Sequence, residues 1–250
     1  MTAEFAIQVC GWLVGVPLEF LVVAALLRGE YRRFPFVFAY ATADLVTTLV
    51  EIPANVDHML HSQDPQIWQH FAHIYWINEV VLRAFILAVV ISLIDQAATH
   101  VRSRRLVRAG LIAGALLFAG ISFALHYRPA MKFFGYWMVP WTRDLNFGSA
   151  ILDLGLWTLL ISSRGGDRRL LLISGALGMQ FAGEAIGYAL SNLSIAQTIN
   201  SLELTGSIIA MLADLVCLYV WWRTFRPSLV TQHVPKIKKG SRRALPRLPG

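Results

Sequence analysis

Residues 5–33 read FAIQVCGWLVGVPLEFLVVAALLRGEYRR, an apolar segment up to Leu27 followed by a gap with three arginines. The apolar part is long enough for an α-helix to cross a bilayer, which takes roughly 20 residues. Comparable segments recur along the chain, at residues 5–27, 35–57, 74–97, 106–126, 141–163, 169–191 and 199–222. The sequence therefore predicts an all-α fold, a polytopic bundle of seven transmembrane helices.

The composition is typical of a membrane protein. Of the 250 residues, 56% are hydrophobic and only 15% are charged, which leaves too little polar surface to coat a water-soluble globule. No basic region precedes the first segment and Glu19 lies well inside it, so we interpret it as a retained helix rather than a secretory signal. We expect a transmembrane domain over residues 1–226 and a basic, disordered cytoplasmic tail over residues 227–250.

The basic residues are concentrated in every second gap, which holds 18 of the 22 Lys and Arg residues. They are Arg28, Arg32 and Arg33; Arg102, Arg104, Arg105 and Arg108; Arg164, Arg168 and Arg169; and eight residues from Arg223 to Arg247. The other gaps hold Arg128, Lys132 and Arg143, while Arg83 lies inside the third segment. Because cytoplasmic loops carry the excess of basic residues, we expect the N-terminus outside and the C-terminus in the cytoplasm.

Small residues four positions apart recur within the segments. The pairs are Gly11 and Gly15, Gly110 and Gly114, Gly183 and Gly187, and Gly206 and Ala210. Such pairs let the backbones of neighbouring membrane helices approach closely. We expect them to make contacts within the chain rather than a dimer interface.

Charged side chains inside the segments are numerous, although an ionised group in hydrocarbon costs about 3 kcal/mol on insertion scales. Those predicted in the outer half of the membrane are Glu51, Glu79, Arg83, Arg143, Asp144, Glu184 and Glu203. Those near the middle or in the inner half are Glu19, Asp44, Asp153 and Asp214. We expect the outer group to line a polar cavity that opens to the outside.

Two arginines of that group suggest a ligand. A guanidinium group holds an anionic or carbonyl-bearing molecule through a fork of donors. We assign ligand charge to Arg83 and Arg143, their orientation to Glu79, Asp144 and Glu184, and a neutral hydrogen bond to Asn146. The alternative is a closed network of ion pairs that fixes helix register and binds nothing.

The acids near the middle have no basic residue beside them within the segments. One interpretation is that Asp44, Asp153 and Asp214 relay protons in a proton-coupled small-molecule transporter. The other is that such carboxyl groups are neutral and donate hydrogen bonds to a neighbouring helix.

Histidines crowd the long outer gap around residues 56–73. They are His58, His61, His70 and His73, with His126 at the outer end of the fourth segment. Imidazoles three apart can bind zinc and leave a position for an activated water, so a membrane-embedded metal-dependent hydrolase is a second alternative. Histidine is also tolerated at the membrane interface without binding metal.

Several cofactors and partners are not indicated by the sequence. The last segment has no lysine for a retinal Schiff base, no glycine-rich phosphate loop is present, and we expect no cofactor. The basic tail suits anionic lipid better than nucleic acid.

Three stretches carry a resemblance. Trp141-Thr-Arg-Asp-Leu-Asn146, Ile151-Leu-Asp-Leu-Gly-Leu-Trp157 and Gly183-Glu184-Ala-Ile-Gly187 together resemble a family of uncharacterised bacterial integral membrane proteins with seven helices and no established activity. The likeness covers roughly the second half of the chain and implies a bacterial inner membrane. The layout is also similar to the seven-helix sensory modules attached to bacterial kinases.

We therefore expect a multi-pass membrane protein that recognises a small ligand or a membrane partner through its outer cavity, without covalent chemistry. Any signal would pass to a separate cytoplasmic effector, for which the basic loops and the tail are the available contact surface.

Overall fold

The computed structural model describes residues 3–60, 65–98, 104–127, 135–162, 167–197 and 200–226, and every regular element in that part of the chain is helical. The helices are α1 (Ala3–Leu27), the short 3-10 helix η1 (Glu30–Arg32), α2 (Pro35–Leu60), α3 (Pro65–Ala97), α4 (Arg104–His126), α5 (Gly135–Ser162), α6 (Arg168–Gln197) and α7 (Asn200–Phe225). Seven of them are long and apolar enough to cross a membrane, which confirms the predicted helical bundle. The predicted tail, residues 227–250, lies outside the described residues.

Two helices begin more than five residues earlier than the sequence predicted. α3 starts at Pro65 instead of residue 74, and α5 starts at Gly135 instead of residue 141. Proline is favoured at the first position of a helix, where its missing N–H leaves no acceptor unpaired. Pro140 lies within α5, early enough that its missing N–H affects only the first turns. Helical hydrogen bonds do not require hydrocarbon, so these helices extend into the polar segments at the ends of the bundle.

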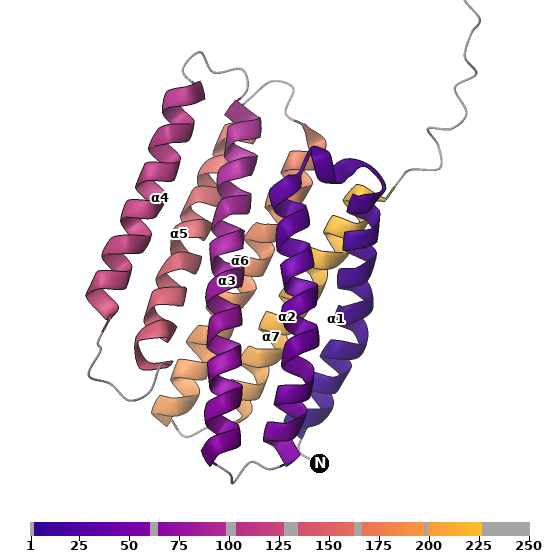
Figure 1. Cartoon of the computed structure of the whole chain (residues 1–250), viewed down its shortest axis with the longest axis vertical. Helices are drawn as coiled ribbons and strands as arrows, with labels where there is room; N and C mark the ends of the chain where they lie inside the picture. Colours follow the sequence, from indigo (N-terminus) through magenta and orange to yellow (C-terminus); the bar gives the residue numbers. More distant parts are fainter. Residues whose placement is uncertain are drawn as a thin grey trace, which may run out of the picture.

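The helices form a ring with one helix outside it (Figure 1). Around the ring, α1, α2, α3, α5, α6 and α7 each contact the next, and α7 closes the ring against α1. α4 lies outside and contacts α5 and α3. Successive long helices are antiparallel, so α1, α3, α5 and α7 finish at the same end of the bundle (Figure 1).

Close backbone contact joins α6 to α7 in the half of the bundle where the N-terminus lies. A Cβ atom added at Gly183 would lie 2.2 Å from the Cβ atom of Ala213. One added at Gly187 would lie 2.8 Å from the carbonyl oxygen of Gly206, and the reverse distance is 2.7 Å. No larger side chain fits at these positions, which confirms the predicted role of these small residues in packing within the chain.

The two other small-residue pairs differ from each other. Gly11 of α1 faces α7, where an added Cβ atom would lie 2.8 Å from the sulfur of Met211. Gly110 and Gly114 of α4 face open space, so the prediction of a contact within the chain is wrong for them. α4 touches the ring on one side only, and these glycines lie on its free side.

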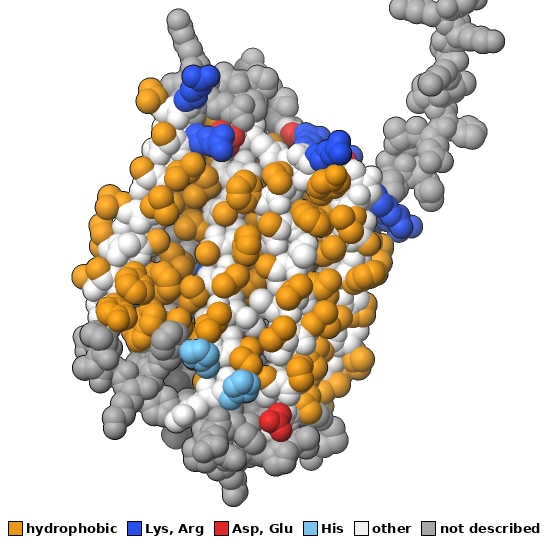
Figure 2. All heavy atoms as spheres, in the orientation of Figure 1, with side chains coloured by type: hydrophobic (Ala, Val, Ile, Leu, Met, Phe, Trp, Pro, Cys, Tyr) orange, Lys and Arg blue, Asp and Glu red, His pale blue; other side chains and the backbone are white. Residues whose placement is uncertain are grey.

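The end of the bundle at which α7 finishes is strongly basic, and we call it the basic end. The arginines at this end whose side chains are described are Arg28, Arg32, Arg33, Arg105, Arg108, Arg168, Arg169, Arg223 and Arg226. Figure 2 shows Lys and Arg side chains gathered at this end of the visible face, with a broad hydrophobic band below them. Arg33 pairs with Asp167, and Arg169 pairs with Glu30, so two ion pairs join η1 and its surroundings to the start of α6.

The apolar core occupies the half of the bundle next to the basic end. Its buried side chains come from the last turns of α1, α3, α5 and α7 and from the first turns of α2 and α6. Trp221 is fully buried there, and its ring lies edge-on to that of Tyr40, with 5.7 Å between the ring centroids. Its Nε1 donates a hydrogen bond of 3.2 Å to the carbonyl oxygen of Ile173. The other half of the bundle, which ends at what we call the open end, contains the polar interior.

Candidate functional site

Arg83 of α3 is the centre of a buried polar cluster. Its Nε donates to Oε1 of Glu79 at 2.8 Å, and its Nη1 donates to Oε2 of Glu184 at 2.6 Å. Asn146 of α5 accepts a weaker bond from the same Nη1 at 3.4 Å and donates from Nδ2 to Glu184 at 2.7 Å. Arg83, Asn146 and Glu184 are each at least nine-tenths buried. Four of the six predicted ligand-binding residues therefore meet at one place, on α3, α5 and α6.

Gln180 extends this cluster to α7. Its Nε2 lies 3.3 Å from Oε1 of Glu184 and 3.1 Å from Oδ1 of Asp214, and the side chain is 4% exposed. A chain of polar side chains thus runs from Arg83 through Glu184 and Gln180 to Asp214.

The structure does not bring the other two predicted residues, Arg143 and Asp144, to this cluster. Arg143 is exposed, and within the described part of the chain it makes no ion pair or hydrogen bond through its side chain. It begins an exposed stripe of α5 that continues with Phe147, Ile151 and Leu154. The two guanidinium groups, of Arg83 and Arg143, therefore do not form a joint site.

Asp144 belongs to a separate contact between α5 and α4. Ser122 donates a hydrogen bond of 2.7 Å to its Oδ2, and Nδ1 of His126 lies 3.6 Å from the same oxygen. This contact ties the peripheral helix α4 to the ring, which is a structural role.

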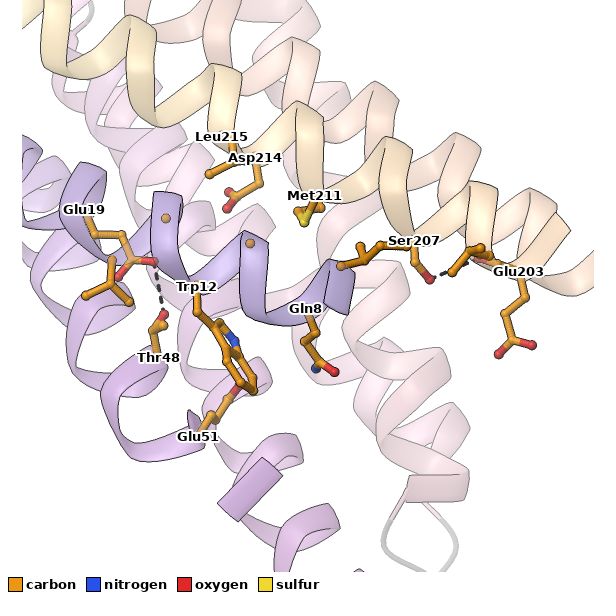
Figure 3. A pocket seen from close by; sticks show the side chains of 15 residues that line it. Gln8, Trp12, Glu19, Thr48, Glu51, Glu203, Ser207, Met211, Asp214 and Leu215 are labelled. Carbon is orange, nitrogen blue, oxygen red and sulfur yellow. Dashed lines mark hydrogen bonds between the residues drawn. The ribbon is translucent and has the colours of Figure 1, made fainter. Parts of the chain in front are cut away.

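A cavity of about 470 Å³ lies between α1, α2 and α7 (Figure 3). We call it the acidic cavity, after the carboxyl groups among its lining residues Gln8, Trp12, Glu19, Glu51, Ser207 and Asp214. Gln8 and Glu203 line it near the open end. Glu19 and Asp214 lie 11 residues further along these same two helices, about 16 Å deeper at 1.5 Å per residue. This depth is about half the thickness of a hydrocarbon layer, which is some 30 Å.

A second cavity of about 350 Å³ lies between α3, α6 and α7. Tyr75, Arg83 and Tyr188 line it, and it shares Ser207, Met211 and Asp214 with the acidic cavity. The shared residues are consecutive inward positions of α7. The polar cluster around Arg83 and the acidic cavity therefore meet at this helix.

The acids around the acidic cavity have neutral partners. Oε1 of Glu19 accepts a hydrogen bond of 3.2 Å from Thr48, whereas its buried Oε2 has no hydrogen-bond partner in the described part of the chain. Glu51 accepts a bond of 2.9 Å from Asn78. Among the described residues, neither Glu19 nor Glu51 forms an ion pair with a basic side chain.

Asp44 of α2 completes this group of acids. It lies close enough to Glu19 and Asp214 for their charges to interact, and its buried Oδ2 has no hydrogen-bond partner among the described residues. Asp153, by contrast, lines neither of the two cavities. Ser174 donates to it at 2.6 Å between α5 and α6. Of the acids predicted to relay protons, Asp44 and Asp214 therefore lie together, and Asp153 lies apart from them.

The predicted histidine site is only partly within the described residues. The side chain of His58 and the whole of His61 lie outside them, while His70 and His73 are exposed on α3. Among the described residues, no group of three or more His, Cys, Asp or Glu side chains could hold a metal ion. The metal-dependent hydrolase stays a prediction.

Sequence reasoning did not single out Gln8, Trp12 and Ser207. The signal lies in helical spacing. On α1, Gln8, Gly11, Gly15 and Glu19 recur three or four positions apart with Trp12 on the same face, and on α7 the residues Glu203, Ser207, Met211 and Asp214 have the same spacing. Each set forms one helix face on which small, polar or acidic residues outnumber the two large ones, Trp12 and Met211.

Comparison of the chain with protein-family models, with curated proteins and with solved structures found no match. The resemblance of the second half of the chain to a bacterial seven-helix family stays a prediction, and the function has to be argued from the geometry of the two cavities.

Proposed function

We propose that this chain is a multi-pass protein of a bacterial inner membrane that recognises a small ligand in the acidic cavity, from the outer side and without covalent chemistry. The observation that carries the proposal is the cavity itself, which runs from the open end to Glu19 and Asp214 and meets the Arg83 cluster there. Its volume is within the usual range for small-molecule sites, about 300–1,000 Å³.

The orientation follows from the arginines. The described arginines outside the bundle interior, apart from Arg143, lie at the basic end, and basic loops face the cytoplasm in membrane proteins. This orientation directs the acidic cavity to the outside and leaves the N-terminus outside and the C-terminus in the cytoplasm.

The apolar core favours recognition over transport. The acidic cavity ends where the buried core begins, and side chains such as Trp221 and Leu218 fill the half beyond it. A carrier would have to open this half, whereas a receptor needs only a small movement of a helix. α7 is suited to pass on such a movement, because it lines both cavities and continues through the core to Arg223.

A proton-coupled transporter remains the second candidate. It is favoured by the proximity of Glu19, Asp44 and Asp214 near the middle of the bundle, where acids often take part in proton transfer.

Labelling of engineered cysteines tests the proposal. In a Cys10→Ala, Cys217→Ala background, Ser207→Cys places a thiol in the acidic cavity and Arg105→Cys places one at the basic end. In spheroplasts, a membrane-impermeant maleimide should label Ser207→Cys from outside and Arg105→Cys only after lysis. Labelling of Arg105→Cys from outside, or no labelling of Ser207→Cys, would overturn the proposed orientation and access.

A further inference from the structure

The ionisable side chains that line the acidic cavity are all acidic. Glu19, Glu51, Glu203 and Asp214 contribute carboxyl groups from three helices, and none of the described residues that line the cavity is Lys, Arg or His. A charged guest in this space therefore meets only carboxyl groups, which attract a cation and repel an anion.

Glu19 supplies an acceptor with no partner. The residue is 5% exposed, lines the cavity from α1, and has one carboxylate oxygen bonded to Thr48 and the other, Oε2, unpartnered and buried. Figure 3 shows the hydrogen bond between Thr48 and Glu19. It also shows that the side chain of Asp214 points from α7 toward α1. A buried polar atom without a partner is uncommon in proteins, and a donor on a bound cation would satisfy it.

The nearest guanidinium group is already engaged. Arg83 forms ion pairs with both Glu79 and Glu184, and it lines only the neighbouring cavity. It therefore offers little positive charge to an anion. This argues against the anionic ligand expected from the sequence, which depended on Arg83 and Arg143 acting together.

The shape of the cavity favours an organic cation over a bare metal ion. A hard metal ion needs about six oxygen ligands within roughly 2.6 Å, and among the described residues no three acidic, His or Cys side chains converge in this way. Instead the cavity is roomy, and it combines carboxyl groups with the indole of Trp12 and apolar side chains such as Leu215. An aromatic face attracts an alkylammonium group, and carboxylates attract its charge.

We propose that the acidic cavity binds a small organic ammonium ion, with its charged nitrogen near Glu19 and Asp214 and its alkyl groups against Trp12. This inference names the ligand class of the site and rests on the proposed function.

Protection of a cysteine from labelling tests the inference. In the Cys10→Ala, Cys217→Ala background, the labelling rate of Ser207→Cys is measured with propylammonium, tetramethylammonium or choline present, each as its chloride. The matched controls are 3,3-dimethylbutan-1-ol, the neutral isostere of choline, and sodium chloride and sodium acetate at the same concentration. We expect slower labelling with at least one ammonium ion and no change with the alcohol or either sodium salt.

The outcomes separate this inference from the proposed function. If Ser207→Cys is labelled from outside but no ammonium ion slows the reaction, the ammonium site is wrong and the outward cavity stands. Equal protection by choline and by its neutral isostere, or protection by acetate, also overturns the ammonium site. If Ser207→Cys is not labelled from outside, the proposed function fails and the inference fails with it.

A substitution locates the charged contact. Using the most protective ammonium ion, we expect Glu19→Gln to raise the concentration needed for half-protection about tenfold, the typical loss of one charge-assisted contact. Asp153→Asn is the matched control, since this buried acid lines neither cavity, and its half-protection should be unchanged. Equal effects of the two substitutions would show that Glu19 does not contact the cation. Thermal unfolding without ligand checks that both variants are folded.

Discussion

The two halves of this bundle differ in how their interiors are filled. The half at the basic end is filled with buried apolar side chains, whereas the half at the open end contains two cavities and several acids, two of which pair with the buried Arg83. Polar groups in hydrocarbon are tolerated where they are paired or reach water. The polar residues are therefore gathered in the half where cavities let them pair with one another and reach water.

One helix, α7, lines the cavities in one half of the bundle and belongs to the apolar core in the other. On α7, Ser207, Met211 and Asp214 line the cavities, and from Cys217 onward the inward residues belong to the apolar core. The boundary lies within a single turn, between Asp214 and Cys217.

The largest effect is expected at Arg83. Arg83→Met leaves the buried carboxyl groups of Glu79 and Glu184 without their cation, and breaking a buried pair in this way costs about 3–5 kcal/mol of unfolding free energy. Arg143→Met is the matched control, because this arginine is exposed and its loss should change the unfolding free energy little. Unfolding in detergent, followed by circular dichroism, measures both. Equal destabilisation by the two substitutions would contradict the difference in their surroundings.

A smaller effect is expected where α6 and α7 touch. Gly187→Val would place side-chain atoms against the backbone of Gly206, and overpacking of this kind costs about 3 kcal/mol at its upper range. Gly114→Val on α4 faces open space and should leave the unfolding midpoint nearly unchanged. If both valines destabilise alike, helix propensity rather than helix contact is responsible.

Substituting one tryptophan in each half compares how much a large side chain there contributes to stability. Trp221→Phe removes a fully buried indole and its hydrogen bond to Ile173, which should lower the unfolding free energy by about 2 kcal/mol. Trp12→Phe in the acidic cavity leaves an aromatic ring beside a space that is already hollow, so its effect should be smaller. The same melting experiment ranks them, and a larger loss for Trp12→Phe would reverse the assignment of the filled and hollow halves.

The smallest effect is expected at the basic end. Arg33 and Arg169 form ion pairs there with side chains 51% and 44% exposed, and exposed pairs contribute about 0–1 kcal/mol. Arg33→Gln should therefore shift the unfolding midpoint slightly at low salt and not at all at high salt, where the pair is screened. A large, salt-independent shift of the midpoint would mean that this pair is needed to hold η1 against the start of α6.

Much of the fold could be predicted from local sequence. The seven helices follow from the length of their apolar segments, and Gly183 and Gly187 follow from their spacing. The pair of Glu79 and Arg83 needs only four-residue spacing on one helix. These features require no knowledge of which helices are neighbours.

The site was harder to predict because it depends on helix rotation and on which helices meet. Arg143 and Asn146 are three residues apart on α5, yet the first is exposed and the second is buried. The exposed apolar residues Phe147 and Ile151, four and eight positions after Arg143, were the available sign that Arg143 lies on the outer face of its helix. The acidic cavity requires α1 and α7 to be neighbours, which no local pattern states.

We infer that water enters the interior of the half at the open end, whereas the buried core of the other half excludes it. In a Cys10→Ala protein, Ser207→Cys reports on the first half and the natural Cys217, which is 2% exposed, reports on the second within the same molecule. The detergent-solubilised protein is treated with a charged methanethiosulfonate, and the modification of each cysteine over time is followed by mass spectrometry. We expect fast reaction at Ser207→Cys and reaction at Cys217 only after denaturation. Comparable rates at the two cysteines in the folded protein would contradict it.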